Sequence, residues 1–589
     1  MRTAFLISGV LAAVGAVAQD TPLQLDDLVV TTATRTETDL NDAMANVRVI
    51  TRDDILRSGA TDSIELLRYF AGIDIARTGG PGQQTSIFMR GAESNHTLVL
   101  IDGVRSNPAT IGVPAIQNIT PEQIDRIEIV TGPRSSLYGS DAIGGVINII
   151  TTAATPERAV SIGGGTNNTE RASAQWGVRR GDTVFRAGID QLRTGGIPTR
   201  STDDTDRGFE NLSARLSLST PVAGGQLIAT HWQASGDAEY SDFFLSPVTQ
   251  EFENQVTTLG WNKTISDQWT TEVIIGRLVD DLQQVESPDF VESTRLSIDW
   301  QNTVQVNANH QVVAGAYLAQ ETGEALSFGL GFDEDVDIRA AYVQDQYRND
   351  RFQALVGIRL SDHEAFGNEL TWNAGAGYNV TDRFTVQLDA GRAFRAPDTT
   401  DRFGFGGNQD LDAETSTQYQ LRGIYSLDNG LRISVEAFRN EIDDLIEFDF
   451  ATFQLFNIAE ATIEGVSADA RWVNDRWQVE VGVTHQDARN AETGTRLLRR
   501  ARVTSSARIS RRFGEHSVDL SWRSDDARRD FGGVRLAGYG IASISGRFAL
   551  TDDLALTARV DNVTDKQFET AAGFNQLGRT TTVQLRYTF

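Results

Sequence analysis

Hydrophobic and polar residues alternate along the chain from about residue 159 to its end at residue 589. In the last segment Val583, Leu585, Tyr587 and Phe589 occupy every second position, with polar residues between them. Successive side chains of a β-strand point to opposite faces, so this spacing predicts strands with one apolar face. A half-buried soluble sheet alternates in the same way, but about 430 residues at roughly 20 per strand and connection gives about 20 strands, more than an open sheet sustains. The pattern therefore predicts a large closed β-barrel.

Residues 25 to 153 have a different pattern. Two short β-branched runs, 127–130 and 146–150, have the composition of buried strands, and the Gly-Pro and Gly-Gly steps between them predict compact turns. Thr51 begins a short helical pattern that ends at Gly59, as helix-capping preferences predict. We therefore expect a small mixed α/β domain with its own core ahead of the barrel.

Residues 1–18 have the features of a secretory signal peptide. Arg2 supplies a positive charge, an apolar run follows, and Ala16-Val17-Ala18 forms a small-residue cleavage site. Beyond residue 20, no stretch has the roughly 20 consecutive apolar residues of a membrane helix. Transmembrane β-strands are only mildly hydrophobic on average, so a membrane barrel stays compatible with this hydropathy.

Composition excludes several functional classes. The chain has no cysteine, which excludes disulfides, thiolate metal sites and cysteine nucleophiles. A formal net charge of -27 argues against nucleic-acid binding, which needs a basic surface. The six histidines are scattered, and no metalloprotease, nucleophile-elbow or Walker A motif occurs. We therefore expect no enzymatic activity, no catalytic cofactor and no nucleic-acid partner.

Motifs in both regions point to one family. They are IFMRG at 87–91, VLIDGV at 99–104 and the Gly-rich stretch at 127–151, followed in the barrel by FRAP at 394–397 and LLRRA at 497–501. The chain resembles TonB-dependent outer-membrane receptors, and within that family it is most similar to the cobalamin-transporting members. The resemblance implies about 22 antiparallel strands that enclose the N-terminal domain as a plug.

The resemblance also implies an organisation and a function. A signal peptide (1–18) is followed by a periplasmic segment (19–34), the plug (35–153) and the barrel (154–589), which crosses the lipid of the bacterial outer membrane many times. The implied function is TonB-dependent import of cobalamin or a related corrinoid. A receptor for ferric siderophores or other metal chelates is an alternative within transport. A barrel that binds or adheres without transporting is an alternative of another class.

The segment DLVVTT resembles the Ton box, the segment that a TonB-type energy-coupling protein binds. It is apolar and β-prone, and therefore suited to adding a strand to a sheet edge of that partner. An ordinary first strand of the plug is the simpler interpretation, but a plug-like domain lies directly downstream. We expect the partner to bind Asp27, Leu28, Val29, Val30, Thr31 and Thr32.

By resemblance, the ligand is bound by two apical loops of the plug, 78–86 and 106–117, together with exposed barrel loops. The residues expected at the ligand are Gln83, Ser86, Glu93, Ile111 and Gly112. Glu93 stands where cobalamin receptors have asparagine, and the second loop is rich in apolar residues, so the ligand's identity stays open. A lone histidine such as His96 is more often packed or hydrogen-bonded than a cobalt ligand.

Cobalamin receptors order their outer loops with calcium held by aspartates. Here Asp204, Asp206, Asp242 and Glu251 occupy comparable hairpins and carry the hard carboxylate oxygens that Ca²⁺ needs. Their spacing does not reproduce the family's pattern residue for residue. A calcium site and a solvated acidic loop therefore both stay open as interpretations.

Receptors of this family also pair plug arginines with two barrel glutamates. Arg90 and Arg134 are present, but the matching barrel positions are Gln420 and Ser467. Buried arginines without carboxylate partners are costly. We therefore expect a nearby glutamate, Glu414 or Glu464, to take over the pairing.

Overall fold

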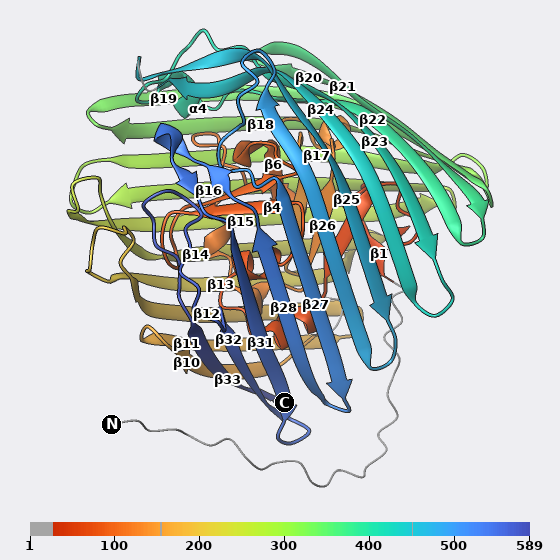
Figure 1. Ribbon diagram of the computed structural model, residues 1–589. Coiled ribbons are helices and arrows are strands. Elements are labelled where there is room, and N and C mark those ends of the chain that lie inside the picture. Colours follow the sequence, from red (N-terminus) through yellow and green to blue (C-terminus); the bar gives the residue numbers. More distant parts are fainter. Residues whose placement is uncertain (1–27, 153–155, 450–451) are drawn as a thin grey trace.

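The computed structural model describes residues 28–152, 156–449 and 452–589, which form a closed barrel around an inner domain (Figure 1). Neighbouring barrel strands pair antiparallel, and β33 pairs with β10 to close the ring. The predicted barrel of 22 strands around a plug is confirmed. Its strands are β10 (Ala159–Gly165), β11 (Thr169–Arg180), β12 (Thr183–Ile197), β13 (Arg207–Val222), β14 (Gly225–Ser241), β15 (Pro247–Ser266), β16 (Trp269–Gln284), β17 (Phe290–Gln305), β18 (His310–Ser327), β19 (Leu330–Arg348), β20 (Phe352–His363), β21 (Gly367–Thr381), β22 (Phe384–Arg395), β23 (Glu414–Ser426), β24 (Leu431–Asp449), β25 (Gln454–Val473), β26 (Trp477–Asn490), β27 (Val503–Phe513), β28 (His516–Asp525), β31 (Tyr539–Ala549), β32 (Leu554–Asp561) and β33 (Thr580–Thr588).

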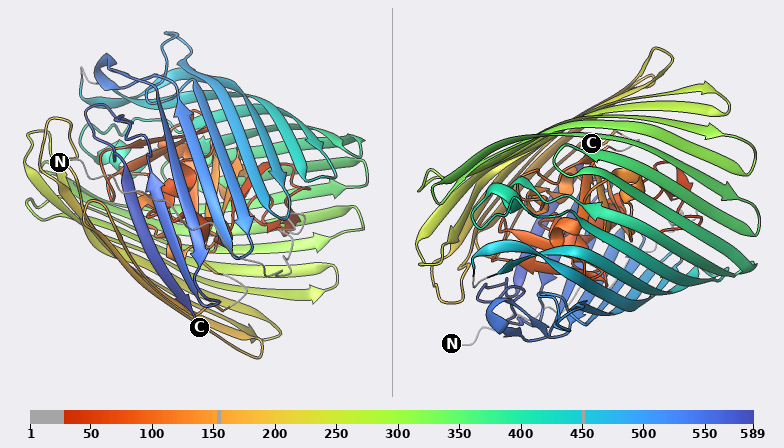
Figure 2. Two further views of the ribbon diagram at one scale, coloured as in Figure 1. Left: turned by 60° about the horizontal axis from the view of Figure 1, so that its bottom comes forward. Right: turned by 90° about the horizontal axis from the view of Figure 1, so that it is seen from above.

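The inner domain, which we call the plug, fills the lumen (Figure 2). Its central sheet has the order β3-β8-β9-β6-β7, in which only the β6–β9 pair is parallel. Its elements are β1 (Val29–Val30), β2 (Thr38–Asp39), β3 (Asn46–Ile50), α1 (Arg52–Ser58), α2 (Ser63–Leu67), β4 (Ile73–Arg77), β5 (Thr85–Met89), η2 (Ser94–His96), β6 (Thr97–Ile101), β7 (Val104–Arg105), η3 (Ile116–Asn118), η4 (Pro121–Gln123), β8 (Arg126–Thr131), α3 (Ser135–Tyr138) and β9 (Gly145–Ile150).

The core of the plug comes from the two β-branched runs seen in the sequence. Ile127 and Ile129 of β8 and Ile147 and Ile149 of β9 are completely buried and belong to one apolar cluster with residues of α1 and α2. Helix α1 begins after a capping box on Thr51 and ends at a left-handed glycine, as predicted. This core holds the central sheet and the two helices of the plug together inside the lumen.

The outer and inner faces of the barrel differ as the alternation predicts. On β20, Val356, Ile358 and Leu360 point outward and are about half exposed, whereas Arg359 and Ser361 are buried on the lumen side. A band of outward apolar residues is typical of a barrel in lipid. No helix in the described part of the chain is long and apolar enough to cross a membrane.

The two ends of the barrel are unequal. One end, here called the short-turn end, has connections of two to four residues, such as 181–182 and 514–515. The other, the long-loop end, carries long connections such as 396–413 and 562–579, together with α4 (Thr399–Phe403), β29 (Arg528–Arg529), η5 (Phe531–Gly533) and β30 (Arg535–Leu536). Outer-membrane barrels have short periplasmic turns and longer extracellular loops. Each site described below is therefore placed at either the long-loop end or the short-turn end.

Candidate functional site

The candidate TonB-binding segment lies beside the central sheet of the plug. Strand β1 pairs antiparallel with β2, Val30 is fully buried, and Val29 is 45% exposed. The amide of Leu40 donates to the carbonyl of Leu28 (2.8 Å) and extends this short hairpin. Of the predicted segment, Asp27 lies outside the described residues.

A buried carboxylate holds the end of this segment. Glu128 of β8 accepts hydrogen bonds from the amides of Thr31 (3.0 Å) and Thr32 (2.9 Å) and from the Thr32 hydroxyl (2.6 Å). Burial raises the pKa of Tyr138, so its hydroxyl stays protonated and donates to the Thr32 carbonyl (3.0 Å). Sequence reasoning missed Glu128, although a carboxylate inside a buried β-branched run was a visible signal.

The residues expected to bind the ligand are spread over the long-loop end of the plug. Gln83 is buried and donates through its side chain to the Glu239 carbonyl of β14 (2.8 Å), while Ser86 is half-buried on β5. Glu93 forms an ion pair with Arg500 of the β26–β27 loop. The side chains of Gln83, in the first apical loop, and of Glu93, beyond it, thus both bind the barrel.

The second apical loop is docked onto α4. The amides of Thr399 and Thr400 donate to the carbonyls of Ala109 and Thr110, each at 3.0 Å. Gly112 has a positive φ of 63°, and a side chain there would meet the Asp398 carboxylate. Ile111 beside it is half-buried. Movement of this loop is therefore linked to movement of the barrel's 396–413 connection.

A charged network under this loop joins the plug to the barrel. His96 is completely buried; its Nδ1 accepts from the Glu93 amide (3.2 Å), so the Nε2–H donates to Glu414 (3.1 Å). Arg395 forms ion pairs with Glu414 (2.7 Å), Asp398 (2.9 Å) and Asp401. His96 is thus a hydrogen-bonded interface residue, as the simpler interpretation of the sequence had it.

The plug arginines have carboxylate partners on the barrel wall. Arg90 forms an ion pair with Glu436 of β24, and both side chains are buried. Arg134 Nη1 lies 3.9 Å from Asp389 Oδ1 on β22. The expected pairing of these arginines with Glu414 or Glu464 is therefore wrong: Glu414 pairs with His96 and Arg395, and Glu464 is exposed.

Strand register explains this correction. Asp389 lies directly opposite Gln420, and Glu436 lies directly opposite Ser467. Side chains opposite each other on neighbouring strands have Cβ atoms about 4.5–5.5 Å apart, so a carboxylate one strand away reaches the same part of the lumen. Sequence spacing alone does not show that Asp389 and Glu436 replace the carboxylates expected at positions 420 and 467, because the facing positions are about thirty residues apart along the chain.

The acidic residues expected to bind calcium do not converge. Asp204 and Asp206 are exposed beside Asp203, while Asp242 Oδ1 accepts two amides of its own turn, and Glu251 lies exposed on β15. Across the described residues, no group of three or more His, Cys, Asp or Glu side chains is placed to hold a metal ion. Ca²⁺ needs six to eight oxygen ligands. Calcium binding therefore stays a prediction, and no step below depends on it.

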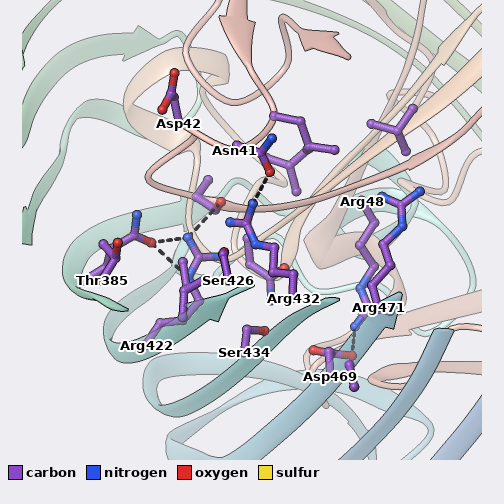
Figure 3. A pocket seen from close by; sticks show the side chains of 18 of the residues that line it. Asn41, Asp42, Arg48, Thr385, Arg422, Ser426, Arg432, Ser434, Asp469 and Arg471 are labelled. Atoms are coloured by element: carbon purple, nitrogen blue, oxygen red, sulfur yellow. Dashed lines mark hydrogen bonds and ion pairs between the residues drawn. The ribbon is translucent and has the colours of Figure 1, made fainter. Parts of the chain in front are cut away.

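A polar cavity of about 830 Å³ lies at the short-turn end, between plug residues 40–49 and the barrel wall (Figure 3). Its wall includes turn residues such as Asn309 and Leu427 and the arginines of β23 and β24. Arg432 reaches from β24 to the side-chain oxygen of Asn41. The cavity is thus remote from the apical loops, on the side of the plug that carries β1 and β2.

Two family models match the chain. The model for the TonB dependent receptor-like β-barrel matches residues 161–563, and that for the TonB-dependent receptor plug domain matches residues 39–146. The chain belongs to the TonB-dependent receptor family. It is therefore an outer-membrane protein that crosses the membrane with its barrel strands, and its short-turn end faces the periplasm. The family consists of receptors and transporters.

Among curated proteins, the chain is 30% identical over 571 residues to the vitamin B12 transporter BtuB of Vibrio vulnificus strain YJ016, covering 93% of this chain and 92% of that protein. Among solved structures, the ferric enterobactin receptor PfeA of Pseudomonas aeruginosa matches with a TM-score of 0.80 at 18% identity, over 95% of this chain and 100% of the other. The ferripyoverdine receptor of the same organism matches with a TM-score of 0.82 at 16% identity, over 95% and 88%. The structural likenesses establish the fold.

Proposed function

We propose that this receptor imports cobalamin or a related corrinoid across the outer membrane, with energy supplied by a TonB-type partner that pulls on Asp27–Thr32. The observation that carries the proposal is the 30% identity to a vitamin B12 transporter over nearly the whole chain, against 18% or less for the two siderophore receptors. The motifs of the plug and barrel, such as IFMRG at 87–91 and LLRRA at 497–501, support the family but decide less about the ligand.

The geometry supports a division of labour between the two ends. At the long-loop end, the plug is bound to barrel loops through Glu93 and through the carbonyls of Ala109 and Thr110 in the second apical loop. A ligand that binds there contacts plug and barrel together. At the short-turn end, β1 is a two-residue strand that pairs with β2, so a partner that adds a strand there competes against this short hairpin and the hydrogen bonds to Glu128.

Equilibrium binding to the purified, detergent-folded receptor tests the ligand. Cyanocobalamin and ferric enterobactin are titrated separately, each with and without Ca²⁺. Saturable binding of cyanocobalamin alone supports the proposal, and weakening of that binding by a chelator supports calcium in the outer loops. Binding of ferric enterobactin alone would replace the corrinoid with a siderophore, the second candidate that the two structural relatives favour.

Uptake by cells tests the coupling segment. Leu28→Pro removes a backbone amide and restricts the preceding residue, which blocks strand addition there. We expect uptake to be lost while surface binding is retained. Leu28→Ala keeps the backbone amide and is expected to lose much less uptake. Full uptake by Leu28→Pro would contradict the assignment of this segment as the coupling segment, and surface binding without uptake by the wild type would favour a receptor that binds without transport.

A further inference from the structure

The cavity at the short-turn end is unusually rich in arginine. Its lining holds Arg48, Arg348, Arg422, Arg432, Arg471 and Arg508. Against these stand four carboxylates, namely Asp42, Asp350, Asp469 and Glu480. The lining thus carries two more positive than negative charges, although the whole chain has a net charge of -27.

Four of the six arginines have a carboxylate partner, and two of these four share Glu480. The ion pairs are Arg348 with Asp42, Arg48 with Asp469, and both Arg471 and Arg508 with Glu480. For Arg422 and Arg432, no carboxylate lies within ion-pair distance among the residues that the structure describes. Arg422 and Arg432 are therefore the two arginines of the lining that have no carboxylate partner among the described residues.

Both side chains bind neutral acceptors, which are plug residues and, for Arg422, also Gln387 of barrel strand β22. Arg422 donates to the carbonyls of Met44 (2.9 Å) and Ala45 (3.1 Å) and to the side chain of Gln387 (2.9 Å). Arg432 donates to the side-chain oxygen of Asn41. Hydrogen bonds from arginine to an oxyanion are roughly twice as strong as neutral ones, and the planar guanidinium matches carboxylate and phosphate geometry. An oxyanion that enters the cavity would therefore compete well for both arginines.

We propose that this cavity is a binding site for an oxyanion, a phosphate or carboxylate group, held by Arg422 and Arg432. The site lies on the periplasmic side of the plug, so it receives a group that has passed the plug or one that enters from the periplasm. Because the same arginines hold plug residues 41–45, a bound oxyanion weakens the hold of the barrel on the segment next to β2. The binding site stands independently of the cargo; its use during import rests on the proposed function.

Titration of the purified receptor with pyrophosphate, a compact polyanion, tests the site. We expect saturable binding that weakens with added salt, because the interaction is electrostatic. Arg432→Gln should lower the affinity at least tenfold. Arg422→Lys should lower it less, because lysine keeps the positive charge and loses only the planar guanidinium that binds two oxygens at once. Arg383→Gln removes an exposed arginine at the same end, outside the cavity and paired with Asp428, and should bind as the wild type does.

Two results would overturn the proposal. One is the absence of saturable pyrophosphate binding by the wild type. The other is an equal affinity in Arg432→Gln and Arg383→Gln. Each variant is first checked for the compact electrophoretic migration of a folded barrel, and Arg422→Lys provides a second variant if Arg432→Gln does not fold.

Uptake measurements identify the source of the anion once binding is established. Reduced uptake by Arg432→Gln at unchanged surface affinity, with normal uptake by Arg383→Gln, assigns the site to an acidic group of the cargo. Normal uptake by both variants assigns it to a free periplasmic anion. If the receptor binds neither cyanocobalamin nor ferric enterobactin at its surface, the proposed import fails, while the pyrophosphate titration still decides the cavity.

Discussion

The two ends of the plug are attached to the barrel in different ways. At the long-loop end, His96, Glu414 and Arg395 form a charged network in which no side chain is more than 1% exposed. At the short-turn end, Arg422 and Arg432 bind neutral acceptors, and the Arg348–Asp42 pair is 53% and 30% exposed. Exposed pairs contribute little to stability, whereas breaking a buried pair is costly. The plug is therefore attached through a buried charged network near the apical loops and through weaker contacts at residues 41–45.

This difference indicates how one part of the plug can detach from the barrel while another part stays bound. A force applied to β1 first meets the short β1–β2 hairpin and then the arginine contacts of residues 41–48. The contacts of Arg422 and Arg432 with residues 41–45 are weaker than the buried network at the far end, because their acceptors are neutral. The periplasmic part of the plug is therefore expected to detach while the apical loops keep their positions.

The largest effect is expected at the buried network. Glu414→Gln leaves His96 and Arg395 without this carboxylate, and we expect a cost on the order of 3 kcal/mol in the stability of the plug against local unfolding. Hydrogen exchange of the β6 amides, Thr97–Ile101, measures it. Glu464→Gln, at an exposed position, is the matched control. Equal exchange in the two variants would contradict a strong attachment at this end.

The second-largest effect is expected at Glu128, the buried carboxylate that binds the coupling segment. Glu128→Gln removes the charge that binds Thr31 and Thr32, which should cost about 1–3 kcal/mol locally. Because the chain has no cysteine, a spin label on Val29→Cys reports this segment alone. We expect a more mobile label in Glu128→Gln and an unchanged spectrum in Glu37→Gln, a control at an exposed residue between β1 and β2.

A smaller effect is expected at the short-turn end. Arg422→Gln removes the donor to the carbonyls of residues 43–45, and the net loss should be about 1–2 kcal/mol because these acceptors are neutral. Hydrogen exchange of the β3 amides, Asn46–Ile50, measures it, with Arg383→Gln as control. A loss as large as that of Glu414→Gln would remove the proposed difference between the two ends.

The smallest effect is expected when the glutamate that pairs with Arg90 is moved from β24 to the facing position on β25. Glu436 and Ser467 are directly opposite, so the double variant Glu436→Ser, Ser467→Glu moves the partner of Arg90 by one strand. We expect stability within about 1 kcal/mol of wild type, whereas Glu436→Ser alone should cost about 3 kcal/mol. Thermal unfolding of the three proteins compares them. A double variant no better than the single one would show that Ser467 does not reach Arg90.

Local sequence was a good guide to elements and a poor guide to partners. The alternation that ends at Phe589 predicted barrel strands, and the β-branched run at 127–130 predicted a buried strand; both are confirmed. The same run hid Glu128, whose role depends on where Thr31 and Thr32 return to the sheet. The sequence around a residue therefore predicts the strand or helix in which the residue lies, but not the residues that its side chain contacts.

By itself, the sequence determined the barrel, the plug, the charge excess and the absence of cysteine chemistry, because periodicity and composition act locally along the chain. Only the tertiary structure decided that Glu436 and Asp389 pair with the plug arginines, and that Glu414 binds His96 and Arg395. It also decided that two arginines without carboxylate partners line one cavity at the short-turn end. These outcomes depend on strand register and on contacts between residues hundreds of positions apart. Register is a property of paired strands, so no single strand's sequence reveals it.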